Sequence, residues 1–348
     1  MDTNVSITLL TPNDYAQWDE YVDSKTASSL YHKTAWIEVI SKTLKQKPLY
    51  LIAKNSDKSI VGVMPIVDLN SWLFGHYMVS MPYFNYGSAI AESIEIEHAL
   101  IKTAIDLAQS SKVSHLQLRA DHELELPDLH VNTHKVNMVL SLPESAEALG
   151  KAIGSKRRSQ IKRPIREGVS HKFGGLELLD DFYHVFCHNM RDLGTPVYSK
   201  AFFSSILETF KDNALLCVVY WQNKPVSTGF LLHYNGRMEI PWASTVKYAN
   251  RISVNMYLYW QILSHAIEQG FKEFDFGRST IDAGTYKFKK QWGAEPQQCY
   301  WYHWVPEGKE VPDLSPSSGK FDLAIKVWQK LPIPITKLIG PPLVRNLP

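Results

Sequence analysis

The sequence predicts an α+β fold that arises from a tandem duplication, in which each copy is a mixed β-sheet flanked by helices. Three observations support this: one order of elements occurs twice, each copy has an amphipathic helix that leads into a strand, and the composition is that of a folded chain. Of the 348 residues, 45% are hydrophobic and 21% are charged, with a net charge of +2. This balance is ordinary for one large or two medium globular domains. Because no overall charge surplus exists, any anion site must come from local clusters.

Each copy is expected to begin with a helix and a two-strand meander. The first copy places these elements at 31–44, 49–53 and 60–66, and the second copy at 198–210, 215–220 and 226–232. Gly62 and Gly229 hold equivalent places in the second strand of each meander. The shared position of these two glycines supports the pairing of the copies.

A second helix follows in each copy, over 98–110 and 255–269, with apolar residues at every third or fourth position. Gly270 ends the later helix in the usual C-terminal manner. Both helices lead into a strand that ends in arginine, over 116–119 and 274–278. Six elements in the same order favour duplication over a chance recurrence of common units.

A basic segment, 145–168, connects the two copies and is predicted to be a helix with one apolar stripe. Pro164 should kink or split this helix, because proline removes a backbone donor and clashes with the preceding turn. Seven cations fall within sixteen residues: Lys151, Lys156, Arg157, Arg158, Lys162, Arg163 and Arg166. One interpretation is a cationic helix exposed to solvent, and the other is a helix that binds phosphate groups.

These features divide the chain into four segments. They are an N-terminal domain over 1–144, the basic connecting helix over 145–168, a C-terminal domain over 169–306, and a Pro-rich amphipathic tail over 307–348. The tail could lie on an anionic membrane surface or dock on the protein itself.

The most informative segment runs from Phe274 to Ser279 and reads as a buried strand with a charged end. After a turn, residues 286–296 combine aromatic side chains with lysines. Together they predict the wall of a site for an anionic, planar or extended ligand. The alternation of aromatic residues and lysines over 286–289 is also typical of a half-buried strand, so a structural interpretation stays open. The first copy lacks this run, which places the expected chemistry in the second copy.

These motifs resemble the FemAB-like branch of the GNAT acyltransferase superfamily, and within it the type associated with exopolysaccharide and PEP-CTERM systems. The resemblance rests on Asp275–Ser279, on Phe288–Gly293, on the two-module pattern and on the basic helix. It implies two GNAT-like domains and the transfer of an acyl or aminoacyl group to an amine. Cell-wall members use aminoacyl-tRNA and carry a Phe-Lys pair in the transfer site, which Phe288 and Lys289 match here.

Two family features are missing. The Arg/Gln-x-x-Gly-x-Gly/Ala loop that holds the acyl-CoA pyrophosphate is replaced by Arg251–Asn255, where helix amides near Ser253 and Asn255 could still bind phosphate. The long helical hairpin of some aminoacyl-tRNA-dependent members is also absent. The donor therefore stays open between acyl-CoA and aminoacyl-tRNA, and no metal is expected.

Amide formation from an activated ester or thioester needs an amine held near the carbonyl, a route for its proton and stabilisation of an oxyanion. We expect Lys289 to supply positive charge and Phe288 to pack the acceptor, while Asp275 accepts the proton or forms a structural ion pair. The substrate-binding candidates are Arg278, Arg191, Tyr198, Tyr286, Trp242, Asn85 and Tyr86, expected to face a cleft between the modules. The phosphate-binding candidates are Lys156, Arg157, Arg158, Lys162, Arg163, Ser253 and Asn255.

The expected function is an N-acyltransferase that acts on an amino group of a cell-envelope or exopolysaccharide precursor, a phosphate-bearing sugar or peptide. One alternative is a non-catalytic scaffold for a phosphorylated glycolipid or a partner of an envelope assembly system. Another is an aminoacyl-tRNA-dependent peptidyltransferase, with tRNA as a partner. Three separate cysteines and no recognisable secretory signal or bilayer-spanning run favour the cytoplasm, with the inner face of the membrane as a second option.

Overall fold

The computed structural model describes residues 5–71, 73–311 and 322–347. The chain forms two compact units. Unit 1 comprises Met1–Val136, Gln298–Leu314 and Arg345–Pro348, and unit 2 comprises Asn137–Gln297 and Ser315–Val344. These units differ from the four expected segments, because both units take residues from each half of the chain and from the tail.

Unit 2 is built on a seven-stranded mixed sheet with the order β11-β12-β13-β14-β15-β10-β16. The strands are β11 (Ser170–Gly174), β12 (Ala214–Trp221), β13 (Lys224–Tyr234), β14 (Arg237–Thr245), β15 (Glu273–Thr280), β10 (Lys135–Ser141) and β16 (Glu295–Gln298). Strands β11 to β14 pair antiparallel, whereas β14 and β15 pair parallel. The parallel pair requires a crossover, and helix α8 (Val254–Glu268) provides it.

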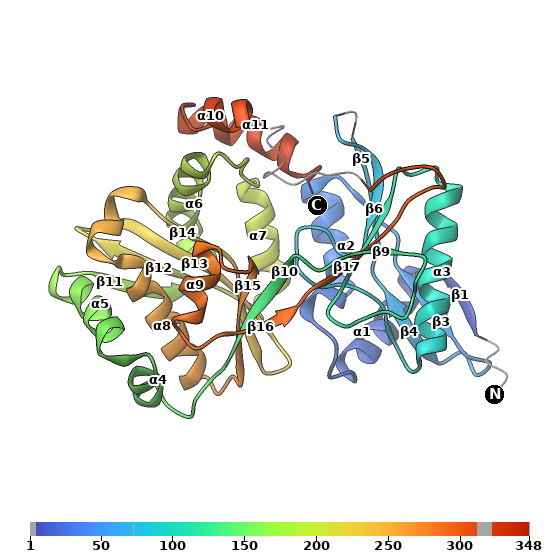
Figure 1. The fold of residues 1–348 in the computed structure, drawn as a ribbon, viewed down its shortest axis with the longest axis horizontal. Helices are drawn as coiled ribbons and strands as arrows, with labels where there is room; N and C mark the ends of the chain where they lie inside the picture. The colour runs from blue at the N-terminus through green and yellow to red at the C-terminus, as the bar shows by residue number, and fades with distance from the viewer. Residues whose placement is uncertain (1–4, 72, 312–321, 348) are drawn as a thin grey trace. The chain divides into compact units, whose positions relative to one another are not determined.

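Helices α6 (Leu179–Leu193) and α8 cover opposite faces of this sheet (Figure 1). Neighbouring residues of a strand point to opposite faces, and β13 shows both packings. Phe230 packs edge-on against Phe182 of α6 at 5.5 Å, and Gly229 faces Ile262 of α8. The other helices of the unit are α4 (Ala146–Ala152), α5 (Gly154–Arg166), α7 (Lys200–Thr209), α9 (Gly284–Lys290), α10 (Asp322–Trp328) and α11 (Ile333–Val344).

Unit 1 contains two sheets rather than one. The first has the order β1-β3-β4-β7 and the second β2-β5-β6-β8-β17-β9. Their strands are β1 (Ser6–Leu9), β2 (Lys47–Pro48), β3 (Leu51–Lys54), β4 (Ile60–Met64), β5 (Val67–Ser71), β6 (Gly75–Val79), β7 (Ile90–Ala91), β8 (Leu116–Ala120), β9 (His130–Asn132) and β17 (Tyr300–Trp304). The helices are α1 (Tyr15–Asp23), α2 (Ala35–Val39) and α3 (Ile94–Ser110), and α3 packs into the main core of the unit.

The equivalence of Gly62 and Gly229 has a physical reason. A Cβ atom at Gly62 would lie 2.9 Å from Leu100 of α3, and one at Gly229 would lie 2.9 Å from Ile262 of α8. Both distances are too short for a real contact. Each glycine therefore lets the long helix of its unit approach the meander closely.

The two halves of the chain exchange strands. Strand β10 follows β8 in the sequence, yet it lies beside β15 in the sheet of unit 2. Strand β17 comes from the end of the second half, yet it pairs antiparallel with β8 in unit 1. This exchange explains why the expected boundaries at 144 and 306 do not coincide with those of the units.

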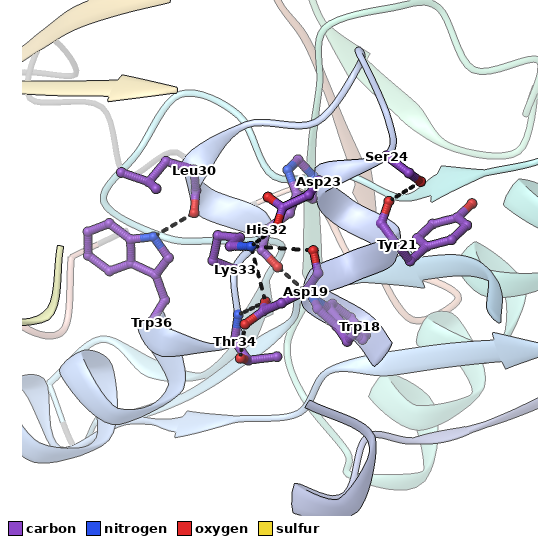
Figure 2. A network of polar contacts seen from close by, with 10 residues as sticks. All are labelled: Trp18, Asp19, Tyr21, Asp23, Ser24, Leu30, His32, Lys33, Thr34 and Trp36. Atoms are coloured by element: carbon purple, nitrogen blue, oxygen red, sulfur yellow. Dashed lines mark hydrogen bonds and ion pairs between the residues drawn. The ribbon is translucent and has the colours of Figure 1, made fainter. Parts of the chain in front are cut away.

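The segment 30–34 is fixed to α1 by polar contacts, which Figure 2 shows. The Asp19 carboxylate accepts hydrogen bonds from the backbone N–H of Thr34 at 2.9 Å and from its hydroxyl at 2.8 Å. The indole N–H of Trp18 donates to the His32 carbonyl at 2.6 Å. These contacts hold the start of α2 against α1 within unit 1.

Two segments differ from interpretations of the sequence: the basic helix is not split at Pro164, and the half-buried strand that was one interpretation of 286–289 does not form. The basic segment is divided at Gly154, which has a φ of +80°, and Pro164 lies inside α5. Residues 286–289 form part of helix α9 rather than a half-buried strand, with the buried Tyr286 and Lys289 one turn apart. The expected linker around Ser315 lies outside the described residues.

We predict that Gly229→Val lowers the free energy of unfolding by about 1–3 kcal/mol, because the added atoms overpack the contact between the sheet and α8. Urea denaturation measures the change. Gly284→Ala is the control, since nothing lies within 4 Å of its Cβ position. Equal midpoints for Gly229→Val and the unchanged protein would contradict the close packing.

Candidate active site

A pocket of about 320 Å³ lies in unit 2 where β14 and β15 part. The two strands pair from Arg237 and Glu273 only as far as Glu239 and Asp275. Beyond these residues, the end of β14, the first turns of α8 and helix α9 form the walls. The lining residues are Asn189, Ala243, Ser244, Thr245, Asn250, Asn255, Tyr259, Gly284, Thr285, Phe288 and Lys289.

Strand β15 continues to Thr280 through Gly277, where the φ of +76° strongly favours glycine. The carboxylate of Asp275, which is 1% exposed, accepts a hydrogen bond from the Gly277 N–H at 2.7 Å. This bond fixes the backbone at Gly277 from within the strand. The carbonyls of Gly277 and Arg278 accept hydrogen bonds from α9.

Lys289 occupies both carbonyls. Its Nζ donates to the Gly277 oxygen at 2.9 Å and to the Arg278 oxygen at 3.0 Å. Burial lowers the pKa of this amine to about 8. The negative charge of Asp275 raises the pKa, and the positive charge of Arg278 lowers it by a smaller amount. An ammonium group has three protons. Because two of them point at carbonyls, one remains for a ligand in the pocket that Lys289 lines.

Phe288 forms an aromatic part of the wall and is half-buried. It meets Tyr259 of α8 edge-on at 5.0 Å, and Tyr259 stacks on Phe276 of β15 at 5.5 Å. Tyr286 is buried on α9, with the Lys290 ammonium 5.8 Å from its ring centre, and is not among the lining residues. The Phe-Lys pair thus borders the pocket, while Tyr286 lies outside its lining.

Small polar residues that the sequence analysis missed form the rest of the wall. The Asn189 amide donates to the Ser244 hydroxyl at 3.2 Å, and the Thr245 hydroxyl donates to Asn255 at 3.5 Å. The hydroxyl groups of Ser227 and Thr245 form a hydrogen bond at 2.6 Å. The one sequence signal was for Ser244 and Thr245, which stand at the end of a strand that leads into a helix. Asn255, expected to bind phosphate, lines this pocket.

Four other predicted substrate-binding residues are not among the residues that line this pocket. Trp242 and Tyr198 belong to one aromatic cluster, 6.0 Å apart and edge-on. Arg191 forms an ion pair with Asp192 at 2.7 Å and donates to a carbonyl of the C-terminal segment. Arg278 is exposed and contributes its carbonyl to Lys289.

Asn85 and Tyr86 belong to unit 1. Asn85 is half-buried and Tyr86 is 8% exposed. The neighbouring Phe84 is 3% exposed and stacks on Tyr31 at 4.1 Å. The segment is therefore packed into unit 1, and its expected role in substrate binding remains a prediction.

A second pocket, of about 520 Å³, lies at the start of α8. It is lined by Ser159, Gln160, Arg163, Arg166, Glu167 and Ser253. Helix α5 packs against α8 (Figure 1), which brings the predicted pair Arg163 and Ser253 together and adds Arg166. The first N–H groups of a helix have no partner within it, so this pocket combines two guanidinium groups with a helix N-terminus.

The remaining cations of α5 are placed differently. Lys156 and Lys162 are exposed, and Arg157 is half-buried. Arg158 donates to the Gly150 carbonyl at 2.7 Å, which ties α5 to the end of α4. None of these four side chains is among the residues that line the pocket.

The sequence of this part of the chain matches a known domain. Residues 155–290 match the model of the acetyltransferase (GNAT) domain. The matched range contains all the residues that line the two pockets. The match supports an acyltransferase at the level of the superfamily. No curated protein sequence matches the chain.

Solved structures resemble the fold over most of the chain. The crystal structure of FemX has a TM-score of 0.65 at 13% identity, covering 86% of this chain and 97% of that one. A C-terminal domain of a putative lysylphosphatidylglycerol synthetase from Agrobacterium fabrum has a TM-score of 0.58 at 10% identity, covering 84% and 91%. A tandem GNAT protein from the clavulanic acid biosynthesis pathway has 0.56 at 10% identity, covering 88% and 100%. The expected α+β fold with tandem GNAT-like domains is confirmed.

The described ranges contain neither a metal cluster nor a helix fit to span a membrane. No group of three or more His, Cys, Asp or Glu side chains there could hold a metal ion. None of the helices in the same ranges combines the length and apolarity that crossing a bilayer requires.

We predict that Lys289→Met removes a pH dependence of stability. The pKa of Lys289 is lowered to about 8 in the folded protein, so between pH 8 and the ordinary lysine pKa the unfolded state binds the extra proton. The free energy of unfolding of the unchanged protein, minus that of Lys289→Met, should therefore rise with pH, by about 2 kcal/mol between pH 7.5 and 9.5. Urea denaturation at both pH values gives the difference.

Lys287→Met is the control for this prediction, because Lys287 is exposed on the same helix. Its stability should follow that of the unchanged protein at both pH values. A constant difference between the unchanged protein and Lys289→Met would show that Lys289 does not lose its proton on folding in this range.

Proposed function

We propose that this protein is an N-acyltransferase that moves an acyl or aminoacyl group from an activated carbonyl donor to an amino group of a cell-envelope or exopolysaccharide precursor. The observation that carries the proposal is the buried ammonium of Lys289 on the wall of the pocket between β14 and β15, with one N–H left over. The acetyltransferase match over 155–290 supports the reaction class.

In the proposed reaction the amine nitrogen attacks the donor carbonyl, and the bond between that carbon and the leaving sulfur or oxygen breaks. The carbonyl oxygen becomes negative on the way, and Lys289 stabilises it through its third proton. No carboxylate or imidazole is among the described residues that line the pocket. The amine is therefore expected to arrive neutral and to pass its proton to the leaving group or to water.

Asp275 takes a positioning role in this proposal. It is buried, it holds the Gly277 N–H and it is not among the lining residues. Its negative charge also opposes the lowering of the Lys289 pKa. We infer that it keeps the lysine charged rather than accepting the proton of the amine. Phe288 packs the acceptor against the aromatic wall.

The donor phosphates are proposed to bind in the second pocket. Arg163 and Arg166 present planar guanidinium groups there, which suit phosphate oxygens, and the start of α8 adds backbone donors. Glu167 lines the same pocket and weakens its positive field. We favour an acyl-CoA thioester as donor, and aminoacyl-tRNA is the other donor that the proposal allows.

The proposal for the acceptor rests on a similarity of fold. The fold resembles a putative lysylphosphatidylglycerol synthetase domain, which supports an acceptor that belongs to the cell envelope. A phosphate-bearing sugar or peptide precursor remains our proposal for its chemistry.

We predict that Lys289→Met lowers kcat by roughly a hundredfold to a thousandfold, as expected for the loss of one oxyanion donor. Thiol release from acetyl-CoA, with a panel of UDP-linked amino sugars as acceptors, measures the rate. Lys287→Met is the matched control and should keep the rate of the unchanged protein. Equal rates for the two variants would remove Lys289 from the mechanism, and no turnover by the unchanged protein with acyl-CoA or aminoacyl-tRNA donors would favour the scaffold alternative.

We also predict that Arg163→Glu raises the KM for acetyl-CoA about tenfold or more, with a smaller effect on kcat, because a charged contact to phosphate typically contributes about 1.5–3 kcal/mol. Lys162→Glu makes the same charge change on the same helix, outside the pocket lining, and should leave the KM within about twofold of its original value. Similar KM values for both variants would indicate a diffuse field rather than a site.

A further inference from the structure

The C-terminal helices expose an unusual amount of apolar surface. Of the fourteen large hydrophobic residues that are exposed among the described residues, five lie between 323 and 339. They are Leu323 (76% exposed), Val327 (53%), Ile335 (42%), Leu338 (75%) and Ile339 (38%). We call these five residues the C-terminal face. Their spacing of three or four within each helix puts them on one stripe of α10 and one stripe of α11.

The helices that carry this face are held to unit 2 by their opposite sides. Gly194 lies so close to Ile325 that a Cβ there would be 2.5 Å from it, and the Gln329 amide donates to the Asp192 carbonyl at 3.1 Å. In α11, Gly340 meets the backbone of Val197. Helix α11 packs against α6 (Figure 1). The C-terminal face is therefore a second apolar surface on helices that are already anchored.

The charges around this face are mostly positive. Residues 322–347 contain four basic residues and one acidic residue, Asp322. Lys326 and Lys330 are exposed, whereas the Lys337 ammonium lies 5.3 Å from the ring centre of Tyr183 on α6. Long lysine side chains can reach from an apolar surface toward phosphate groups while their methylene stems stay on the apolar side.

We propose that the C-terminal face docks on an anionic membrane surface. Helices α10 and α11 would lie in the plane of the interface, with the five apolar side chains at the level of the upper acyl chains and the lysines at the lipid phosphates. A second copy of this chain is a poorer occupant, since a symmetric contact would bring the lysines of two identical faces together. The docking goes beyond the proposed transfer reaction and does not depend on it.

Vesicle flotation tests the proposal, with phosphatidylcholine alone or mixed 7:3 with phosphatidylglycerol. The full chain should bind the anionic vesicles at least tenfold more tightly than the neutral ones. The double variant Leu323→Glu, Leu338→Glu should lose at least tenfold in binding to the anionic vesicles. Leu9→Glu changes a 45% exposed leucine of unit 1 and is the control that should bind unchanged.

The charge requirement is tested separately with Lys326→Glu, Lys330→Glu, which should lose the preference for anionic lipid. Thermal unfolding shows that each variant is folded, and acetyl-CoA turnover reports on the transfer site independently. Binding that is equal for both vesicle types, or unchanged in the leucine variant, overturns the proposal. A dimer in sedimentation that Leu338→Glu dissociates also overturns it, because the face is then covered by a second copy.

Discussion

The site depends on one buried ammonium group. Lys289 links helix α9 to strand β15 through the backbone carbonyls of Gly277, where the φ is +76°, and Arg278. The carboxylate of Asp275 holds the Gly277 N–H and provides the nearby negative charge that a buried cation needs. The same contact that fastens α9 therefore also sets the charge of the pocket wall, so that local stability and the proposed chemistry rest on one side chain.

Duplication supplies the scaffold twice, but the two copies differ beyond the last paired residues of their parallel strands. In unit 1, β6 and β8 are the parallel pair, and the buried Arg119 occupies the region beyond it. Its guanidinium donates to the Phe84 carbonyl at 2.6 Å and lies 4.2 Å from the ring centre of Trp301. In unit 2 the corresponding region holds the pocket with Lys289. This difference gives a structural reason to place the transfer in unit 2.

The elements whose apolar residues recur at a regular spacing could be predicted from the sequence, and the elements without such a spacing could not. Helix α8 and strand β15 follow from their apolar patterns, and the Phe-Lys pair follows from its motif. Helix α9 was not foreseen, and a half-buried strand stayed open as one interpretation of 286–289, because a helix of seven residues is too short to show a helical period. Asn189 and Ser244 reach the pocket from elements far apart in the chain, and small polar residues have no periodic signal.

The exchange of strands shows why sequence segments and physical units differ here. The acetyltransferase match covers 155–290, yet the sheet of unit 2 also contains β10 and β16, which lie outside that range. Strand β10 lies next to β15, the strand that carries Asp275 and Gly277. A segment cut to the matched residues would leave β15 as an edge strand with unpaired backbone groups. Because the pocket is lined next to β15, the proposed catalytic unit must include a strand from the first half of the chain.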